Sequence, residues 1–173
     1  MFGEFSSKIQ HNPTSNEVFL DTITLGNYIK HDSSPDVIIG LSRGGLIPAV
    51  ILSHYLGKPF IPVVFSGADG NGDNKLQTSL ALLPELDKSK KYLIVDDICD
   101  SGDTLTKMVN HYSSKGVSVE TAVLYYKDRW PQYQLHDPQH GYCPNYLLHR
   151  IPEHSGWIVF AWENVPQAIR THI

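Results

Sequence analysis

Short, uninterrupted apolar runs separated by polar loops predict several buried strands in the first three quarters of the chain. Residues 36–41 and 91–95 are rich in β-branched side chains and lack polar interruptions. Such runs are typical of strands buried on both faces of a parallel sheet. Residues 60–65 and 117–126 are predicted as further strands, and Pro62 favours a strand beginning or an edge position for the first of these.

Helical spacing of apolar residues appears between these strands. Helices are predicted over residues 18–29, 46–56 and 105–114. Thr14 or Ser15, ahead of Glu17, is a candidate cap for the first, while Gly57 and Gly116 are expected to end the other two. Strand, helix and strand joined by short connections indicate a doubly wound α/β sheet.

The pattern changes after residue 128, where proline, histidine and aromatic residues dominate. We expect a small hood of loops over one end of the sheet, with short strands at 146–148 and 157–160. The polar stretch 66–78 is read as a mobile lid or a disordered connection. Four histidines lie in the hood, at positions 136, 140, 149 and 154. Their spacing makes exposed loop histidines a better interpretation than structural zinc.

Composition narrows the class of protein. A chain of 173 residues, 41% hydrophobic and 18% charged, argues for one globular domain and against a disordered chain. The net charge of −4 gives no basic footprint for nucleic acid. The chain has only two cysteines, Cys99 and Cys143, which do not form a CxxC motif. This low cysteine content favours a reducing, cytoplasmic location. The first five residues do not look like a signal peptide, and no apolar run is long enough for a membrane span.

Two loops at the expected carboxyl ends of strands carry the candidate chemistry. In open α/β sheets, ligands bind at this edge. Residues 42–45, with two glycines and Arg43 before a helix, form a possible anion site, although a plain tight turn explains them equally well. Residues 96–104 are more specific. They combine four carboxylates, which need a cation or hydroxyl donors between them, with hydroxyls and amides at a helix N-terminus that suit a phosphate.

Other loop motifs fit residues 96–104 or 40–45 poorly. An EF-hand requires Gly where Ser101 stands, and no Gly-Lys-Ser/Thr sequence is present for a Walker A loop. The glycines at 40–45 do not have the Rossmann spacing. A phosphorylated sugar satisfies both the carboxylates and the donors of residues 96–104.

Residues 92–104 resemble the phosphoribosyl pyrophosphate (PRPP) motif of type I phosphoribosyltransferases, departing from it only at Cys99, where an aliphatic residue is usual. Residues 37–45 look like the pyrophosphate loop of that family and the strand before it. The likeness is closest to bacterial xanthine-guanine and hypoxanthine phosphoribosyltransferases, and covers about residues 36–65 and 91–163. It implies a twisted, mainly parallel α/β sheet flanked by helices in one domain, with a core at about 15–127 and the hood at about 128–173.

The resemblance also implies a reaction, in which phosphoribose passes from PRPP to a 6-oxopurine and yields a nucleoside monophosphate and pyrophosphate, as in purine salvage. Asp100 corresponds to the general acid/base that faces N7 of the purine. The residues implied to bind PRPP are Asp96, Asp97, Ser101, Gly102, Asp103 and Thr104 for the ribose and 5′-phosphate, with Ser42, Arg43 and Gly44 for pyrophosphate. Lys127, Trp157 and Ile158 are implied to bind the base. Mg²⁺ is the expected cofactor, with Asp97 and Glu163 as candidate ligands.

Some positions depart from the closest relatives. Val159 stands where the xanthine-guanine enzymes carry a Glu that reads the purine 2-position, so the resemblance favours hypoxanthine over guanine. The predicted lid lacks the usual tyrosine, and residues 132–141 look like an insertion. A pyrimidine acceptor, or a non-catalytic regulator that binds PRPP or a nucleotide, remains an alternative. A homodimer or homotetramer is expected by resemblance, with no membrane partner.

Overall fold

In the residues that the computed structural model describes, 12–65, 80–128 and 142–163, five parallel strands form one sheet in the order β2-β1-β3-β4-β5. The strands are β1 (Val37–Ser42), β2 (Phe60–Val64), β3 (Lys91–Cys99), β4 (Ser118–Asp128) and β5 (Tyr146–Pro152). The helices are α1 (Ser15–Asp32), α2 (Leu46–Leu56), α3 (Asp103–Ser114) and the short 3₁₀ helix η1 (Leu80–Leu82). The predicted lid and insertion, with His136 and His140, lie outside the described residues.

The ends of the helices follow the sequence signals. Thr14 caps α1, since its side chain accepts from the Glu17 amide at 3.2 Å while its own amide donates to the Glu17 carboxylate at 2.7 Å. This reciprocal capping box satisfies two amides that the first turn leaves free. Helix α2 ends at Gly57, whose φ of +64° is the left-handed conformation that terminates many helices.

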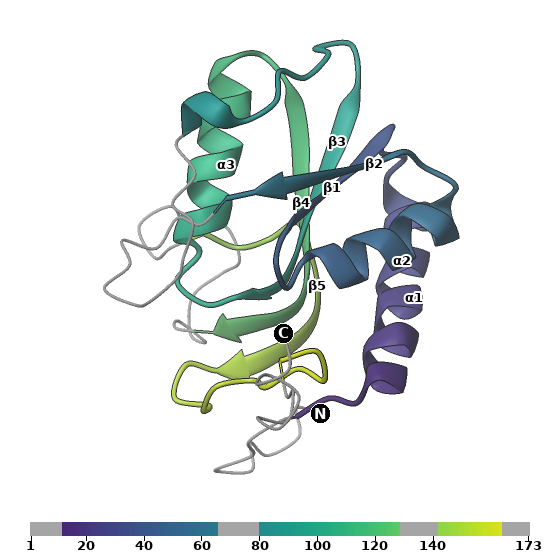
Figure 1. Ribbon diagram of the computed structural model, residues 1–173, viewed down its shortest axis with the longest axis vertical. Helices are drawn as coiled ribbons and strands as arrows, with labels where there is room; N and C mark the ends of the chain where they lie inside the picture. The colour runs from purple at the N-terminus through teal and green to yellow at the C-terminus, as the bar shows by residue number, and fades with distance from the viewer. Residues whose placement is uncertain (1–11, 66–79, 129–141, 164–173) are drawn as a thin grey trace, which may run out of the picture.

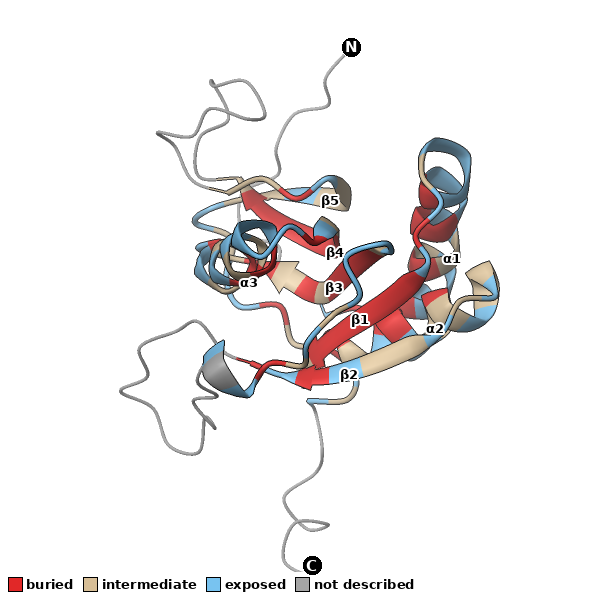
Figure 2. Ribbon diagram, turned by 90° about the horizontal axis from the view of Figure 1, so that it is seen from above, coloured by how far each residue is buried: buried red, intermediate tan, exposed pale blue. Residues whose placement is uncertain are grey.

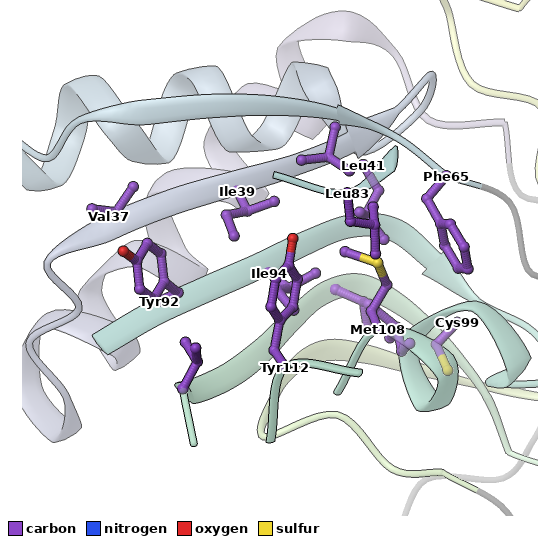
Figure 3. Packing of buried hydrophobic residues seen from close by; sticks show 14 of the residues in the cluster. Val37, Ile39, Leu41, Phe65, Leu83, Tyr92, Ile94, Cys99, Met108 and Tyr112 are labelled. Carbon is purple, nitrogen blue, oxygen red and sulfur yellow. The ribbon is translucent and has the colours of Figure 1, made fainter. Parts of the chain in front are cut away.

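The sheet has helices on both faces (Figure 1), with α1 and α2 on one face and α3 on the other. Strands β1, β3 and β4 are therefore buried on both sides, as Figure 2 shows. On the α3 side, Ile39 and Ile94 pack against Met108 and Tyr112 of the helix (Figure 3). On the other side, the alternate residues of the same strands pack against α1 and α2. The predicted α/β sheet with buried central strands is confirmed.

Two details of the predicted strands are wrong. Strand β3 does not stop at residue 95, because Ile98 and Cys99 still pair with Tyr125 and Tyr126 of β4. Residues 157–160 form no strand. Ile158 and Phe160 are apolar because they are buried in the core on the α1–α2 side, with 3% and 1% exposure, and that burial needs no strand partner.

The expected hood contributes to the main sheet. Strand β5 pairs in parallel with β4 from Ala122↔Tyr146 to Asp128↔Pro152, so part of this segment is an edge strand. The opposite edge is β2, which contains Pro62, and Pro62 therefore occupies the edge position that the sequence favoured. None of the helices in the described segments combines the length and apolar character that a membrane crossing requires.

Candidate functional site

The two loops that carry the candidate chemistry, residues 42–45 and 96–104, meet where β1 and β3 end. A Cβ built on Gly45 would lie 2.5 Å from the Val95 carbonyl oxygen and 2.7 Å from the Asp96 Cα atom. One built on Gly44 would overlap the Asp97 carboxylate. Only glycines therefore allow the 42–45 loop to lie directly against β3. The Ser42–Arg43 peptide bond is cis, and the Arg43 side chain is exposed.

Asp96 and Asp97 form an interacting carboxyl pair under this loop. Burial raises the pKa of Asp96 well above its usual value, and the charge of Asp97 raises it further. Burial also raises the pKa of Asp97 to about 6, although hydrogen bonds from Asp96 and from the Ile98 amide, at 2.8 Å, oppose the shift. Successive side chains of a strand ordinarily point to opposite sides. Instead, the Asp96 carboxylate turns back to accept the Asp97 amide at 3.0 Å, so the two carboxyl groups interact.

Glu163 brings a third carboxylate toward this pair. Its negative charge raises the pKa of Asp97 further, which places the two groups within electrostatic reach. One Glu163 carboxylate oxygen also accepts the Phe160 amide at 3.2 Å. Within the described ranges, no group of three or more His, Cys, Asp or Glu side chains is arranged to hold a metal ion. Two oxygen donors nevertheless suit Mg²⁺, which protein sites often hold through one or two carboxylates together with substrate phosphates.

Residues 101–104, which we call the phosphate cradle, follow β3 at the N-terminus of α3. Gly102 stands at the N-cap of α3 with φ +82°, a conformation that favours glycine. The Asp103 amide donates to the Ser101 hydroxyl at 3.3 Å. The first turn of α3 begins here, so its N-terminal amides and the positive end of its dipole face the same point. Ser101 and Asp103 are exposed and Thr104 is partly buried, which leaves this loop open to a ligand.

On the side of the cradle toward β4, a lysine and an aspartate form an ion pair. The Lys127 ammonium donates to the Asp100 carboxylate at 3.0 Å. The same ammonium lies 5.6 Å from the centroid of the Trp157 ring, which is 58% exposed. Ile158 is buried in the core, so only its backbone can meet a ligand. The geometry thus places a donor, an acceptor and an aromatic face together.

The structure therefore gathers the residues that the sequence singled out at one edge of the sheet. Gly44 lies against Asp97, and Ser42 and Arg43 precede it in the same loop. The cradle 101–104 follows Asp100, and Lys127 lies between Asp100 and Trp157. Gly45 was predicted only as part of the 42–45 loop and not among the residues implied to bind PRPP, although its amide bonds the Asp96 carboxylate. Sequence reasoning missed Tyr142, which lies 2.9 Å from a Cβ built on Gly102. The Gly-Gly pair was a signal for the first, whereas nothing local marked the second.

Comparison with known proteins agrees with this geometry. The phosphoribosyl transferase domain profile matches residues 22–145. The chain belongs to this family. Among solved structures, the chain is similar to the purine phosphoribosyltransferase of Pyrococcus horikoshii Ot3, with 32% identity and a TM-score of 0.68, over 93% of this chain and 97% of that one. The resemblance to the type I family and the predicted fold class are thereby confirmed.

Two curated relatives match over shorter stretches. The xanthine-guanine phosphoribosyltransferase of Vibrio vulnificus (strain YJ016) is 36% identical over 75 residues, which are 43% of this chain and 47% of that protein. The orotate phosphoribosyltransferase of Sulfurisphaera tokodaii is 30% identical over 109 residues, which are 62% of this chain and 52% of that protein. The chain thus spans about half the length of the curated relatives it matches.

Proposed function

We propose that this protein transfers phosphoribose from PRPP to a 6-oxopurine, forming a nucleoside monophosphate and pyrophosphate. The observation that carries the proposal is the Lys127–Asp100 ion pair at 3.0 Å, set beneath an exposed Trp157 ring and next to the cradle of residues 101–104. A 6-oxopurine presents an exocyclic oxygen that accepts from an ammonium group, an adjacent ring nitrogen that meets a carboxylate, and a flat face for stacking.

The other parts of the site match the two ends of PRPP. The amides and hydroxyls of residues 101–104 bind the 5′-phosphate at the N-terminus of α3. The amides of the 42–45 loop and the Arg43 guanidinium bind pyrophosphate, since a guanidinium fork complements phosphate oxygens. Asp96 and Asp97 bind the ribose hydroxyls between these anion sites.

The reaction forms a bond from a purine ring nitrogen to C1′ of the ribose and breaks the bond from C1′ to pyrophosphate. Positive charge develops on the sugar ring, so the neighbouring carboxylates stabilise the transition state. The purine loses its ring proton, which Asp100 accepts while Lys127 holds the exocyclic oxygen. Asp97 and Glu163 would hold Mg²⁺, which would supply charge neutralisation for the leaving pyrophosphate.

A pyrimidine acceptor is the second candidate, and the match to the orotate enzyme of Sulfurisphaera tokodaii favours it. The base contacts come from Lys127 and from residues 157–158, so the base is decided there and not in the PRPP loop. Val159 follows directly and carries no hydrogen-bond acceptor in its side chain. We therefore expect hypoxanthine to be preferred to guanine, whose exocyclic amine needs an acceptor.

The test is pyrophosphate release from PRPP and Mg²⁺ with single bases: hypoxanthine, guanine, xanthine, adenine, uracil and orotate. Turnover limited to 6-oxopurines supports the proposal. Turnover with orotate or uracil replaces it with the second candidate. PRPP or nucleotide binding without turnover for any base indicates a regulator on the same fold.

The substitution Lys127→Gln tests the proposed role of Lys127 in binding the exocyclic oxygen of the base. We expect the KM for the base to rise at least tenfold while the KM for PRPP changes little, because a charged hydrogen bond is worth about 1.5–3 kcal/mol. Lys91→Gln is the matched control, since Lys91 pairs with Glu120 at 2.7 Å at the opposite end of β3. An equal effect of both substitutions on the base KM contradicts the assignment of Lys127.

A further inference from the structure

The segment that precedes β5 packs against the cradle for the 5′-phosphate. A Cβ built on Gly102 would lie 2.9 Å from the Tyr142 Cβ atom, 3.4 Å from the Tyr142 carbonyl oxygen and 3.5 Å from its nitrogen. Gly102 is itself buried. Tyr142 therefore packs directly on the backbone of Gly102, the N-cap of α3, although it lies 40 residues further along the chain.

Tyr142 is in turn fixed to the sheet through its hydroxyl group. The hydroxyl lies 2.7 Å from the Thr121 hydroxyl, and Thr121 of β4 is completely buried. Thr121 donates to the Asn145 side-chain oxygen at 3.2 Å. The Tyr142 and Thr121 hydroxyls share this bond, and either of them can donate. Burial raises the pKa of Tyr142 to about 12, which keeps its hydroxyl protonated for this bond.

Asn145 completes the connection by bonding the same threonine from the other side. The Asn145 side-chain oxygen accepts a hydrogen bond from the Thr121 main-chain amide at 2.9 Å. The Asn145 main-chain amide donates to the Thr121 hydroxyl at 3.2 Å. The Thr121 hydroxyl thus has three hydrogen-bond partners, the Tyr142 hydroxyl and two atoms of Asn145. Because Thr121 is buried, these bonds hold Tyr142 in one arrangement against β4.

We propose that Tyr142 is a positioning residue for the phosphate cradle. It transmits the rigidity of β4, through Thr121, to Gly102 and to the amides that surround the 5′-phosphate. The inference rests on the proposed function only in taking residues 101–104 as the phosphate site. The base and pyrophosphate ends of the substrate make no use of this support.

Tyr142→Phe removes the hydroxyl and leaves the ring. We expect the KM for PRPP to rise about fivefold to tenfold, as for one lost hydrogen bond. The dissociation constant for ribose 5-phosphate, measured by calorimetry, should rise by the same factor. The KM for the base and the affinity for pyrophosphate should remain within twofold of the wild type.

Tyr112→Phe is the matched control. Tyr112 is a fully buried tyrosine of α3 whose hydroxyl bonds the Pro84 carbonyl oxygen at 3.2 Å, away from Gly102. The Tyr112→Phe variant loses a hydroxyl hydrogen bond in the core cluster on the α3 side of the sheet. Tyr142 packs against this same cluster. The ribose 5-phosphate affinity of Tyr112→Phe should therefore be that of the wild type, even where its stability falls as far as that of Tyr142→Phe.

The proposal is overturned if both variants weaken ribose 5-phosphate equally, if Tyr142→Phe binds it as tightly as the wild type, or if pyrophosphate weakens by the same factor. Should Tyr142→Phe fail to fold, Thr121→Val removes the same bond from the sheet side and is judged by the same criteria. If the proposed function is wrong, the wild-type protein shows no turnover with any base. The ribose 5-phosphate binding measurements still test the role of Tyr142 in that case.

Discussion

Asp97→Asn should make the protein more stable at neutral pH while weakening its activity. Asp97 is 8% exposed and lies beneath Gly44. Burial raises its pKa to about 6, from an ordinary value of 3.8. The unfolded chain therefore loses this proton at a lower pH than the folded protein does. Between about pH 4 and pH 6 the folded state binds more protons, so stability falls as pH rises through this window.

The size of the effect follows from the shift. A difference of about two units corresponds to about 3 kcal/mol of unfolding free energy. Asparagine keeps a side-chain oxygen for the Ile98 amide but carries no charge to desolvate. We expect Asp97→Asn to recover up to about 3 kcal/mol at pH 8 and almost none at pH 4, where the wild-type carboxyl is largely protonated. The gain in stability at a site residue is expected to accompany a loss of turnover.

The assay is urea unfolding of both proteins at pH 4, 5, 6, 7 and 8 without substrate. Asp103→Asn is the control, because Asp103 is an exposed carboxylate in the first turn of α3. Its removal should cost a few tenths of a kcal/mol at pH 8, since a negative charge there favours the helix dipole. A variant at Asp97 that is less stable than the wild type at pH 8, or equally stabilised at pH 4 and pH 8, would refute the reasoning.

Two further substitutions test the chemistry of the site. Asp100→Asn should lower kcat by about 10²–10⁴-fold while PRPP still binds, because it removes the proposed proton acceptor; near-normal turnover in steady-state kinetics would sink this assignment. Gly44→Ala introduces a methyl group that overlaps the Asp97 carboxylate, so the 42–45 loop must shift. We expect at least a tenfold loss of pyrophosphate affinity by calorimetry, whereas Gly57→Ala, at an open position beyond α2, should leave that affinity intact.

The central strands and the helix ends could be predicted because their signals are local. β1 and residues 92–95 of β3 are continuous apolar runs, and the capping box of α1 lies within four residues. The strand identity of residues 96–99 was hidden by two polar side chains. Only pairing with β4, 27 residues away in sequence for Ile98 and Tyr125, keeps this segment extended. Residues 157–160 show the converse, since a strand-like apolar run is explained by packing alone.

The site could be predicted as a set of loops, but its contacts depend on sheet register. Cys99 pairs with Tyr126 across β3 and β4. Asp100, directly after β3, and Lys127, the next residue of β4, therefore come within ion-pair distance. A shift of one residue in this register would turn Lys127 to the other face of the sheet. The contact between Tyr142 and Gly102 is less predictable still, because it joins the start of α3 to a segment with no regular structure of its own.

The Lys127–Asp100 pair also argues for function on energetic grounds. Lys127 is only 8% exposed, whereas 37% of the Asp100 side chain is exposed. The lysine therefore loses most of its hydration in exchange for a partner that water still screens, and buried ion pairs of this kind rarely add to stability. An apolar residue at this buried position of β4 would fold as well. A costly ammonium group directed at an exposed carboxylate and an exposed indole is better explained by a ligand that enters among the three groups and accepts from it.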